Sequence, residues 1–69
     1  MTPPRVLITK MFLARRRLGL TQKAVADEVG VTQPRISAWE TGMVTIPEAR
    51  RALIGIALGL DPDTLTDEA

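Results

Sequence analysis

The chain has 69 residues, enough for one small domain, and its amino acids exclude several kinds of site. It contains no cysteine, histidine or tyrosine, which rules out disulfides, thiolate and imidazole metal sites, and nucleophiles activated by histidine. Neither a glycine-rich phosphate loop nor a calcium-loop pattern occurs. We therefore expect no enzymatic activity, no catalytic residue, no metal and no cofactor.

Apolar residues make up 45% of the chain, a proportion typical of globular domains. The longest apolar run, residues 52–60, is too short for the roughly 20 residues that span a bilayer. The N-terminal segment lacks the apolar stretch and cleavage site of a secretory signal. We expect a cytoplasmic protein that does not contact a membrane.

Charge is distributed unevenly along the chain. Residues 1–41 contain seven basic and three acidic side chains, whereas residues 42–69 contain two basic and five acidic ones. A basic half favours a nucleic-acid partner. An ordinary solvated surface of uneven composition would give the same counts, so charge alone leaves both interpretations open.

Apolar spacing predicts that the first helix covers residues 7–18, because Leu7, Met11, Ala14 and Leu18 form a stripe along one helical face. Further helices are predicted over residues 22–29, 33–41, 47–58 and 61–65, each except the last followed directly by a glycine.

Capping residues support these boundaries. Thr21 and Thr32 stand where N-caps are expected, and Pro34 and Pro47 fall in first turns, where a missing N–H costs nothing. No alternating strand pattern competes. We predict an all-α domain of five helices over residues 7–65, with an N-terminal tail over 1–6 and a frayed acidic tail over 66–69.

The fourth predicted helix covers residues 47–58. Its inward residues are predicted to be Ala49, Ala52, Leu53, Ile56 and Ala57.

The segment over residues 22–40 has the pattern of two helices that cross steeply at a tight turn. Gly30 supplies the backbone conformation that the turn needs, and Ala26 is small where the helices cross. The apolar residues expected to face inward are Val25, Val29, Val31, Ile36 and Trp39. This is a helix-turn-helix arrangement, whose second helix is presented outward.

The segment from Lys10 to Leu65 resembles the phage-repressor and Cro family of helix-turn-helix domains, of the xenobiotic-response-element type. The motifs that carry the resemblance are RRRLGLTQ (15–22), AVADEVGVTQPRIS (24–37), WETG (39–42) and IPEARRALIGIALGL (46–60). The resemblance implies a lambda-repressor-like fold and a transcriptional regulator that binds double-stranded DNA sequence-specifically. Its recognition helix, residues 33–41, would enter the major groove.

Five residues of that helix are predicted to reach DNA bases. Gln33, at the helix tip, can pair bidentately with adenine, and the resemblance implies the same role. Pro34 and Ala38 either pack on thymine methyl groups or are simply small surface residues. Ser37 contacts base or phosphate. Arg35 reads guanine or neutralises a phosphate, and its flanking position slightly favours phosphate.

Phosphate contacts are predicted from residues around the recognition helix, namely Arg16, Gln22, Lys23, Thr32 and Thr41. Gln22 and Thr32 lie at helix N-termini, where N–H groups favour a phosphate oxygen, although both positions also suit capping. The resemblance implies that Gln22 braces Gln33 while donating to a phosphate. Arg16 is either solvated or turned toward phosphate.

Two charged residues have a structural interpretation. A helical wheel places Glu40 on the inward side of its helix and Arg15 beside the apolar stripe of the first helix. The resemblance suggests that they form an ion pair between the helices, whose loss would leave a partly buried charge unpaired.

The loop over residues 43–46 departs from the family, because it holds Met43, Val44, Thr45 and Ile46 where basic residues often contact the DNA backbone. Either the electrostatic affinity is modest, or this apolar loop packs against another protein. The second possibility supports an alternative function, an antitoxin or protein-interaction module built on the same fold.

Family members usually bind DNA as two-fold dimers, so the resemblance also implies a homodimer. We expect the pairing surface in the region of the fourth and fifth helices, where Ile54, Leu58, Leu60 and Leu65 exceed what one thin core can bury.

Overall fold

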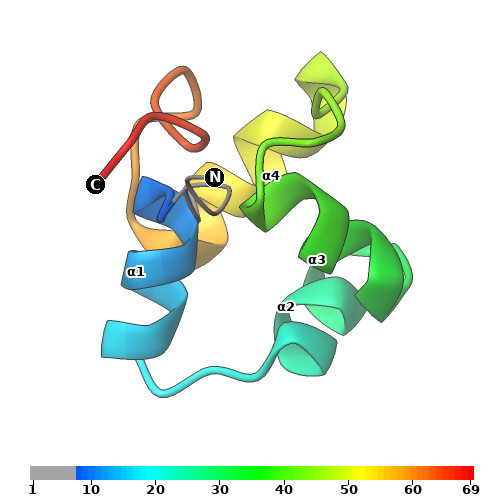
Figure 1. The fold of residues 1–69 in the computed structure, drawn as a ribbon. Helices are drawn as coiled ribbons and strands as arrows, with labels where there is room; N and C mark the ends of the chain where they lie inside the picture. Colours follow the sequence, from blue (N-terminus) through cyan, green and yellow to red (C-terminus); the bar gives the residue numbers. More distant parts are fainter. Residues whose placement is uncertain (1–7) are drawn as a thin grey trace, which may run out of the picture.

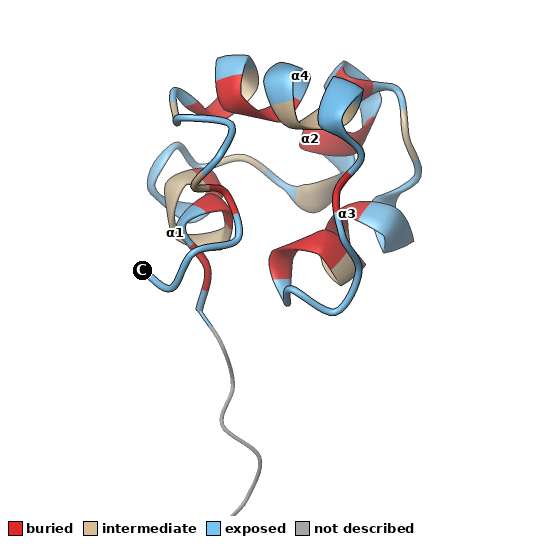
Figure 2. Ribbon diagram, turned by 90° about the horizontal axis from the view of Figure 1, so that it is seen from above, coloured by how far each residue is buried: buried red, intermediate tan, exposed pale blue. Residues whose placement is uncertain are grey.

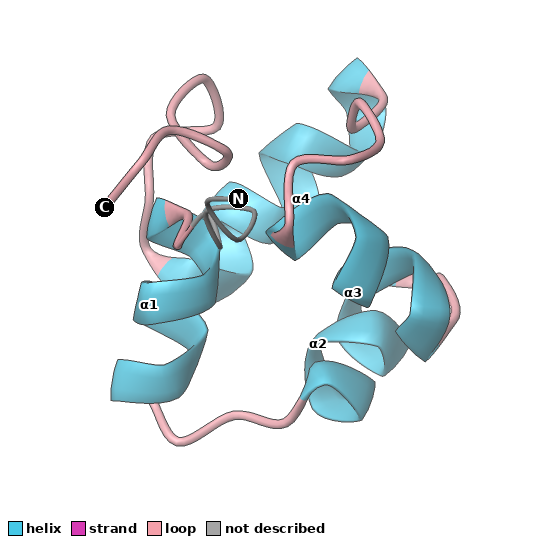
Figure 3. Cartoon of the chain, in the orientation of Figure 1, coloured by secondary structure: helices cyan, strands magenta, loops and turns pink. Residues whose placement is uncertain are grey.

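The computed structural model describes residues 8–69, and this part of the chain contains four helices and no strand (Figure 1, Figure 3). The helices are α1 (Lys10–Arg17), α2 (Gln22–Val29), α3 (Gln33–Glu40) and α4 (Glu48–Leu58). The predicted all-α class is therefore confirmed.

Threonine side chains set two of the helix starts. The hydroxyl of Thr9 accepts from the Phe12 amide at 3.3 Å, and that of Thr21 accepts from the Ala24 amide at 3.0 Å. Thr32 occupies the N-cap position of α3 as predicted, but its side chain makes no capping bond. Because Thr9 caps α1, the helix begins at Lys10, later than predicted, and Leu7 lies outside the described residues.

The core lies where α4 crosses α2 and α1 and where α3 packs on α2 (Figure 1, Figure 2). Trp39 is its largest side chain and is fully buried. The other buried apolar residues are Met11, Val25, Ala26, Val29, Ile36, Ile46, Ile54, Leu58 and Leu65. Of the residues predicted to face inward in the α2–α3 segment, only Val31 is half-buried rather than buried.

The predicted fifth helix is wrong, because residues 61–65 form turns (Figure 3). The Asp61 carboxylate accepts from the Asp63 amide at 2.9 Å, and the Asp61 carbonyl accepts from the Thr64 amide at 3.0 Å. The Leu65 carbonyl then accepts from the Met11 amide at 2.9 Å. These separate turns bring the chain back to the start of α1.

The predicted fraying of residues 66–69 is also wrong. The Asp67 carbonyl accepts from the Lys10 amide and the Ala69 amide donates to the Ile8 carbonyl, both at 2.8 Å. A single antiparallel bridge joins Thr9 to Glu68. These bonds fix the end of the described chain beside α1, which Figure 1 shows as the red segment close to the blue helix.

Helix α4 is rotated relative to the prediction. Its buried residues are Ile54, Gly55 and Leu58. Of the five residues predicted to face inward, Ala57 is half-buried and the others, Ala49, Ala52, Leu53 and Ile56, are exposed.

Close backbone packing explains the rotation. A Cβ at position 55 would lie 2.7 Å from the Leu60 carbonyl oxygen, so only glycine fits where the chain turns back against α4. On the neighbouring side, Arg50 Nη1 donates to the Val29 carbonyl of α2 at 2.8 Å. In α1, Leu18 departs similarly from its predicted stripe, since the helix ends at Arg17 and leaves this side chain exposed.

Candidate nucleic-acid interface

A tight turn fixes α3 across α2. Gly30 has φ 81°, a left-handed conformation that favours glycine, and its amide donates to the Ala26 carbonyl at 2.8 Å. The Val31 amide donates to the same carbonyl at 2.9 Å. Two bonds to one carbonyl close α2 and redirect the chain, so α3 begins three residues after Gly30.

The inner face of α3 is buried as the helical wheel predicts. Ile36, Trp39 and Glu40 are each at most 2% exposed. The N-terminal tip of α3 is open to solvent, with Gln33 and Pro34 both exposed, and Pro34 lies on the side opposite the buried face.

The remaining predicted α3 residues lie around this tip. Arg35 and the C-cap residue Thr41 are exposed, whereas Ser37 and Ala38 are only half-buried and so project less than the wheel suggests. The Thr41 hydroxyl donates to the Ala38 carbonyl at 2.9 Å, which satisfies one carbonyl of the last turn.

The expected ion pair between Arg15 and Glu40 is present and buried. Arg15 Nε lies 3.0 and 2.9 Å from the two carboxylate oxygens of Glu40. Arg15 Nη1 donates to the Leu20 carbonyl at 2.7 Å, and the Thr9 hydroxyl donates to the Glu40 carbonyl at 2.7 Å. The guanidinium also stacks over the Phe12 ring, 5.5 Å from its centroid. This cluster joins α1 to the C-terminal end of α3.

Polar contacts continue from this ion pair to the tip of α3. Gln22 Nε2 donates to Glu40 Oε1 at 3.5 Å, and Gln33 Nε2 donates to Gln22 Oε1 at 3.4 Å. Both distances lie at the long end for a hydrogen bond, so these side chains are oriented without being locked. The amide of Gln33 thereby keeps hydrogen-bonding capacity for another partner.

Comparison with known proteins supplies the family. A family model described as helix-turn-helix matches residues 13–65, from the middle of α1 to the last buried leucine. The chain belongs to the Cro/C1-type helix-turn-helix family. No curated protein and no solved structure matches it.

Family membership identifies the protein as a DNA-binding regulator of the Cro/C1 type. In such a domain the second helix of the motif is the one that enters DNA, and here that helix is α3. Across residues 8–69, no helix combines the length and the apolar character needed to cross a bilayer.

The polar surface of this helix-turn-helix domain continues from α3 onto neighbouring elements. An open hollow beside Gln33 is lined by Arg16, Thr21 and Gln22 among other residues. The guanidinium of Arg16 lies 5.7 Å from the centroid of the Phe12 ring.

Thr32 and Lys23, which are also predicted to contact phosphate, differ in whether their polar groups already have a partner. Thr32 is exposed with a hydroxyl that makes no capping bond. Lys23 is exposed and pairs with Asp27 at 3.2 Å, so a phosphate would compete with that carboxylate.

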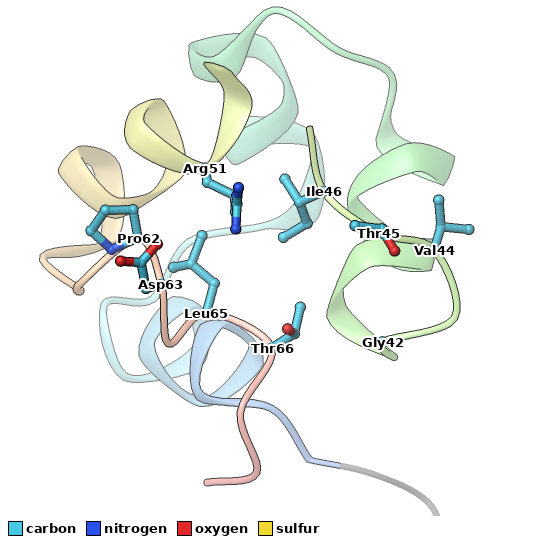
Figure 4. A pocket seen from close by; sticks show the side chains of 9 residues that line it. All are labelled: Gly42, Val44, Thr45, Ile46, Arg51, Pro62, Asp63, Leu65 and Thr66. Carbon is cyan, nitrogen blue, oxygen red and sulfur yellow. The ribbon is translucent and has the colours of Figure 1, made fainter. Parts of the chain in front are cut away.

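A second hollow lies away from α3, between the α3–α4 loop and the C-terminal turns (Figure 4). Its volume is about 130 Å³, below the roughly 300 Å³ at which ligand pockets begin. Arg51 lines it together with Ile46 and Asp63, and the buried Nε of Arg51 has no hydrogen-bond partner among the described residues.

Sequence reasoning missed two structural residues, Thr9 and Arg50. Thr9 precedes α1, is fully buried, and donates its hydroxyl hydrogen bond to the Glu40 carbonyl of α3. Arg50 donates a hydrogen bond to the Val29 carbonyl of α2. Threonine is a favoured N-cap residue, and a predicted first helix that began at Lys10 instead of Leu7 would have placed Thr9 at the N-cap.

Proposed function

We propose that the protein is a sequence-specific, Cro- or repressor-like regulator that binds double-stranded DNA with α3 in the major groove. The observation that carries the proposal is the exposed N-terminal tip of α3, Gln33 and Pro34, on a helix whose inner face is anchored through Glu40. A rigid helix with a solvated polar tip suits direct reading of base edges.

Gln33 is the principal base-reading residue in this proposal. Its amide offers a donor and an acceptor to adenine N7 and N6, and its contact with Gln22 limits the directions in which it points. Pro34 packs on a thymine methyl group. Arg35 contacts guanine or the phosphate beside it, and the half-buried Ser37 and Ala38 contribute only where the groove approaches closely.

The phosphate contacts of the proposal surround this tip. Gln22 stands at the first position of α2 and Thr32 at the N-cap of α3, where backbone N–H groups attract an anion. Arg16 and Lys23 add positive charge, and a phosphate at the far end of α3 would compete with the Ala38 carbonyl for the Thr41 hydroxyl proton.

The proposal is tested by selecting binding sites from random duplexes and then titrating the enriched site. Gln33→Ala should relax specificity at one position of each half-site and weaken binding by about 1–3 kcal/mol. Glu28→Ala, a change at an exposed residue of α2, is the control and should leave the preferred sequence unchanged. Absence of an enriched site at low salt would contradict the proposal.

A protein-interaction module, such as an antitoxin, is the second candidate. It is favoured by the loop after α3, where Met43 is 83% exposed and Val44 46% exposed. Exposed apolar side chains at this place suit a protein surface better than a phosphate backbone. DNA binding with almost no salt dependence, together with a co-purifying partner that Met43→Asp removes, would favour this candidate over the first.

Two-fold pairing belongs to the proposal, because one domain reads only half of a palindromic site. The residues expected to form the pairing surface do not fit that role, since Ile54, Leu58 and Leu65 are buried in the chain's own core and Leu60 is half-buried. A homodimer formed in the region of α4 must therefore use a different face of that helix.

A further inference from the structure

Helix α4 carries a charged residue on its buried side. The buried residues of this helix are Ile54, Gly55 and Leu58. Arg51 precedes them by three, four and seven positions, which is the spacing of one helical face. An inward position of this kind normally holds an apolar side chain, because a charge loses hydration there. Arg51 is therefore a half-buried cation at a place where packing alone would favour an apolar residue.

The guanidinium of Arg51 makes no hydrogen bond or ion pair within residues 8–69. Its Nε atom is buried without a partner, and the ion pairs of this part of the chain join other residues. The adjacent Arg50 differs, since its Nη1 donates to the Val29 carbonyl at 2.8 Å. Buried donors are almost always paired, and an exception points to a partner from outside the chain, such as a water or an ion.

Arg51 faces the small hollow between the α3–α4 loop and the C-terminal turns. Figure 4 shows its nitrogen atoms between the side chains of Asp63 and Ile46. The other polar side chains of the lining are Thr45, Thr66 and Asp63. Threonine hydroxyls can donate to oxygen atoms, as the guanidinium does. The hollow thus has hydrogen-bond donors from α4, the loop and the turns.

Two of the lining side chains are charged, and they have opposite signs. Arg51 is half-buried, whereas Asp63 is exposed, and within the described chain they form no ion pair with each other. An anion that approaches Arg51 also meets the field of the Asp63 carboxylate. The guanidinium balances one negative charge, and Asp63 repels a second. The lining therefore favours an anion with a single charge.

The size of the hollow limits the ligand further. Its volume is about 130 Å³. A cavity of roughly 150 Å³ holds benzene, which has six non-hydrogen atoms. A ligand of about six such atoms or fewer therefore fits, and a drug-sized molecule does not.

We propose that Arg51 is the centre of a binding site for a small monocarboxylate. The Nε–H and a neighbouring Nη–H of an arginine form a planar fork that matches the two oxygens of a carboxylate. In this arrangement Thr45 and Thr66 lie beside the ligand, and Asp63 excludes anions with two charges. The site goes beyond the proposed function and does not depend on it, because it lies away from the tip of α3.

Binding at this site is expected to be weak and stabilising. For a ligand of four non-hydrogen atoms, such as acetate, the upper limit of binding energy per atom corresponds to a Kd of about 40 µM. We expect a Kd between this limit and about 10 mM. Since the ligand would contact three segments that meet only in the folded chain, it should raise the Tm.

The first test is a titration of the ¹⁵N-labelled full chain with sodium acetate, without DNA, at an ionic strength kept constant with sodium chloride. The Arg51 Nε–H signal, identified by its loss in Arg51→Met, should shift and reach saturation together with the amide signals of residues 44–46 and 63–66. Sodium sulfate should give no saturating shift. If acetate shifts none of these signals up to about 100 mM, water alone partners Arg51 and the proposal fails.

The second test compares substitutions of two arginines. Acetate should raise the Tm of the original chain and of Arg17→Gln, a control that removes an exposed arginine from α1, but not that of Arg51→Met. In chloride alone, Arg51→Met should melt no lower than the original chain, because it removes an unpartnered buried donor. A clearly lower Tm in chloride would show that Arg51 already bonds a group of its own chain, and it would overturn the proposal.

Two conservative variants test the roles of the fork and of Asp63. Arg51→Lys keeps the charge but loses the planar fork, so it should bind acetate roughly tenfold more weakly. Asp63→Asn removes the repelling carboxylate and should allow sulfate to bind with a saturating shift. Unchanged acetate binding in Arg51→Lys would contradict bidentate binding, and sulfate that binds the original chain as tightly as acetate would contradict the selection for one charge.

Discussion

Helices α3 and α4 differ in how clearly their sequences indicate which side faces the core. In α3, large apolar side chains occur on one side only, at Ile36 and Trp39, and the structure buries that side. In α4, large apolar residues occur on opposite sides, at Ile54 and at Ile56, so periodicity alone does not determine the buried side. A helix with one apolar face has its orientation set locally, whereas a helix with two takes it from its neighbours.

The largest expected effect comes from the ion pair that anchors α3. Arg15→Ala leaves the Glu40 carboxylate buried without its cation and should lower the free energy of unfolding by about 3–5 kcal/mol. Urea unfolding followed by tryptophan fluorescence of Trp39 measures the change. Lys23→Ala, which removes an exposed ion pair, is the control and should change stability by less than about 1 kcal/mol. Similar losses of stability in both variants would mean that the buried ion pair contributes no more to stability than the exposed one.

The two isoleucines of α4 test which side of this helix faces the core. Ile54→Ala opens a cavity in the core and should cost about 2–5 kcal/mol, because this side chain is fully buried. Ile56→Ala removes an exposed side chain and should cost less than about 0.5 kcal/mol. Thermal unfolding of both variants in dilute solution checks the assignment of the two faces, and a reversed order would refute it.

The smallest expected effect concerns the threonines before α2 and α3. Thr21→Ala removes a capping bond and should destabilise the fold by about 1 kcal/mol. Thr32→Ala should cost less, because its side chain makes no such bond, and should instead weaken DNA binding. Equal losses of stability would indicate that Thr32 caps α3 in solution, and unchanged DNA affinity would remove Thr32 from the phosphate contacts.

Local chemistry made α2 and α3 predictable. Their first residues follow threonines, and the turn between them needs the left-handed conformation that Gly30 adopts. The position of Gln33 at an exposed tip followed from its place as the first residue of the helix, and the link between Arg15 and Glu40 followed from the family resemblance. The contact between Gln22 and Gln33 was also implied by the resemblance, whereas the contact between Gln22 and Glu40 and the role of Thr9 were not evident from the sequence.

The errors lie where distant segments meet. Residues 61–65 have a good cap and a first-turn proline, yet they form turns, and the Leu65 carbonyl bonds the Met11 amide at the start of α1. The acidic end of the chain pairs with Thr9 for the same reason, since the α1 terminus has amides that need acceptors. Sequence patterns describe near neighbours along the chain and carry no information about such partners.

By itself the sequence determined the all-α class, the family, the α2–α3 unit and the exposed end of α3, because capping, turn geometry and one-sided apolar spacing act over a few residues. Only the tertiary structure decided how α4 is rotated and how the chain ends. Both depend on contacts between segments far apart in the chain, among them Arg50 with the Val29 carbonyl and the amides of Lys10 and Met11 with the carbonyls of Asp67 and Leu65. The same packing leaves Ile56 on the surface.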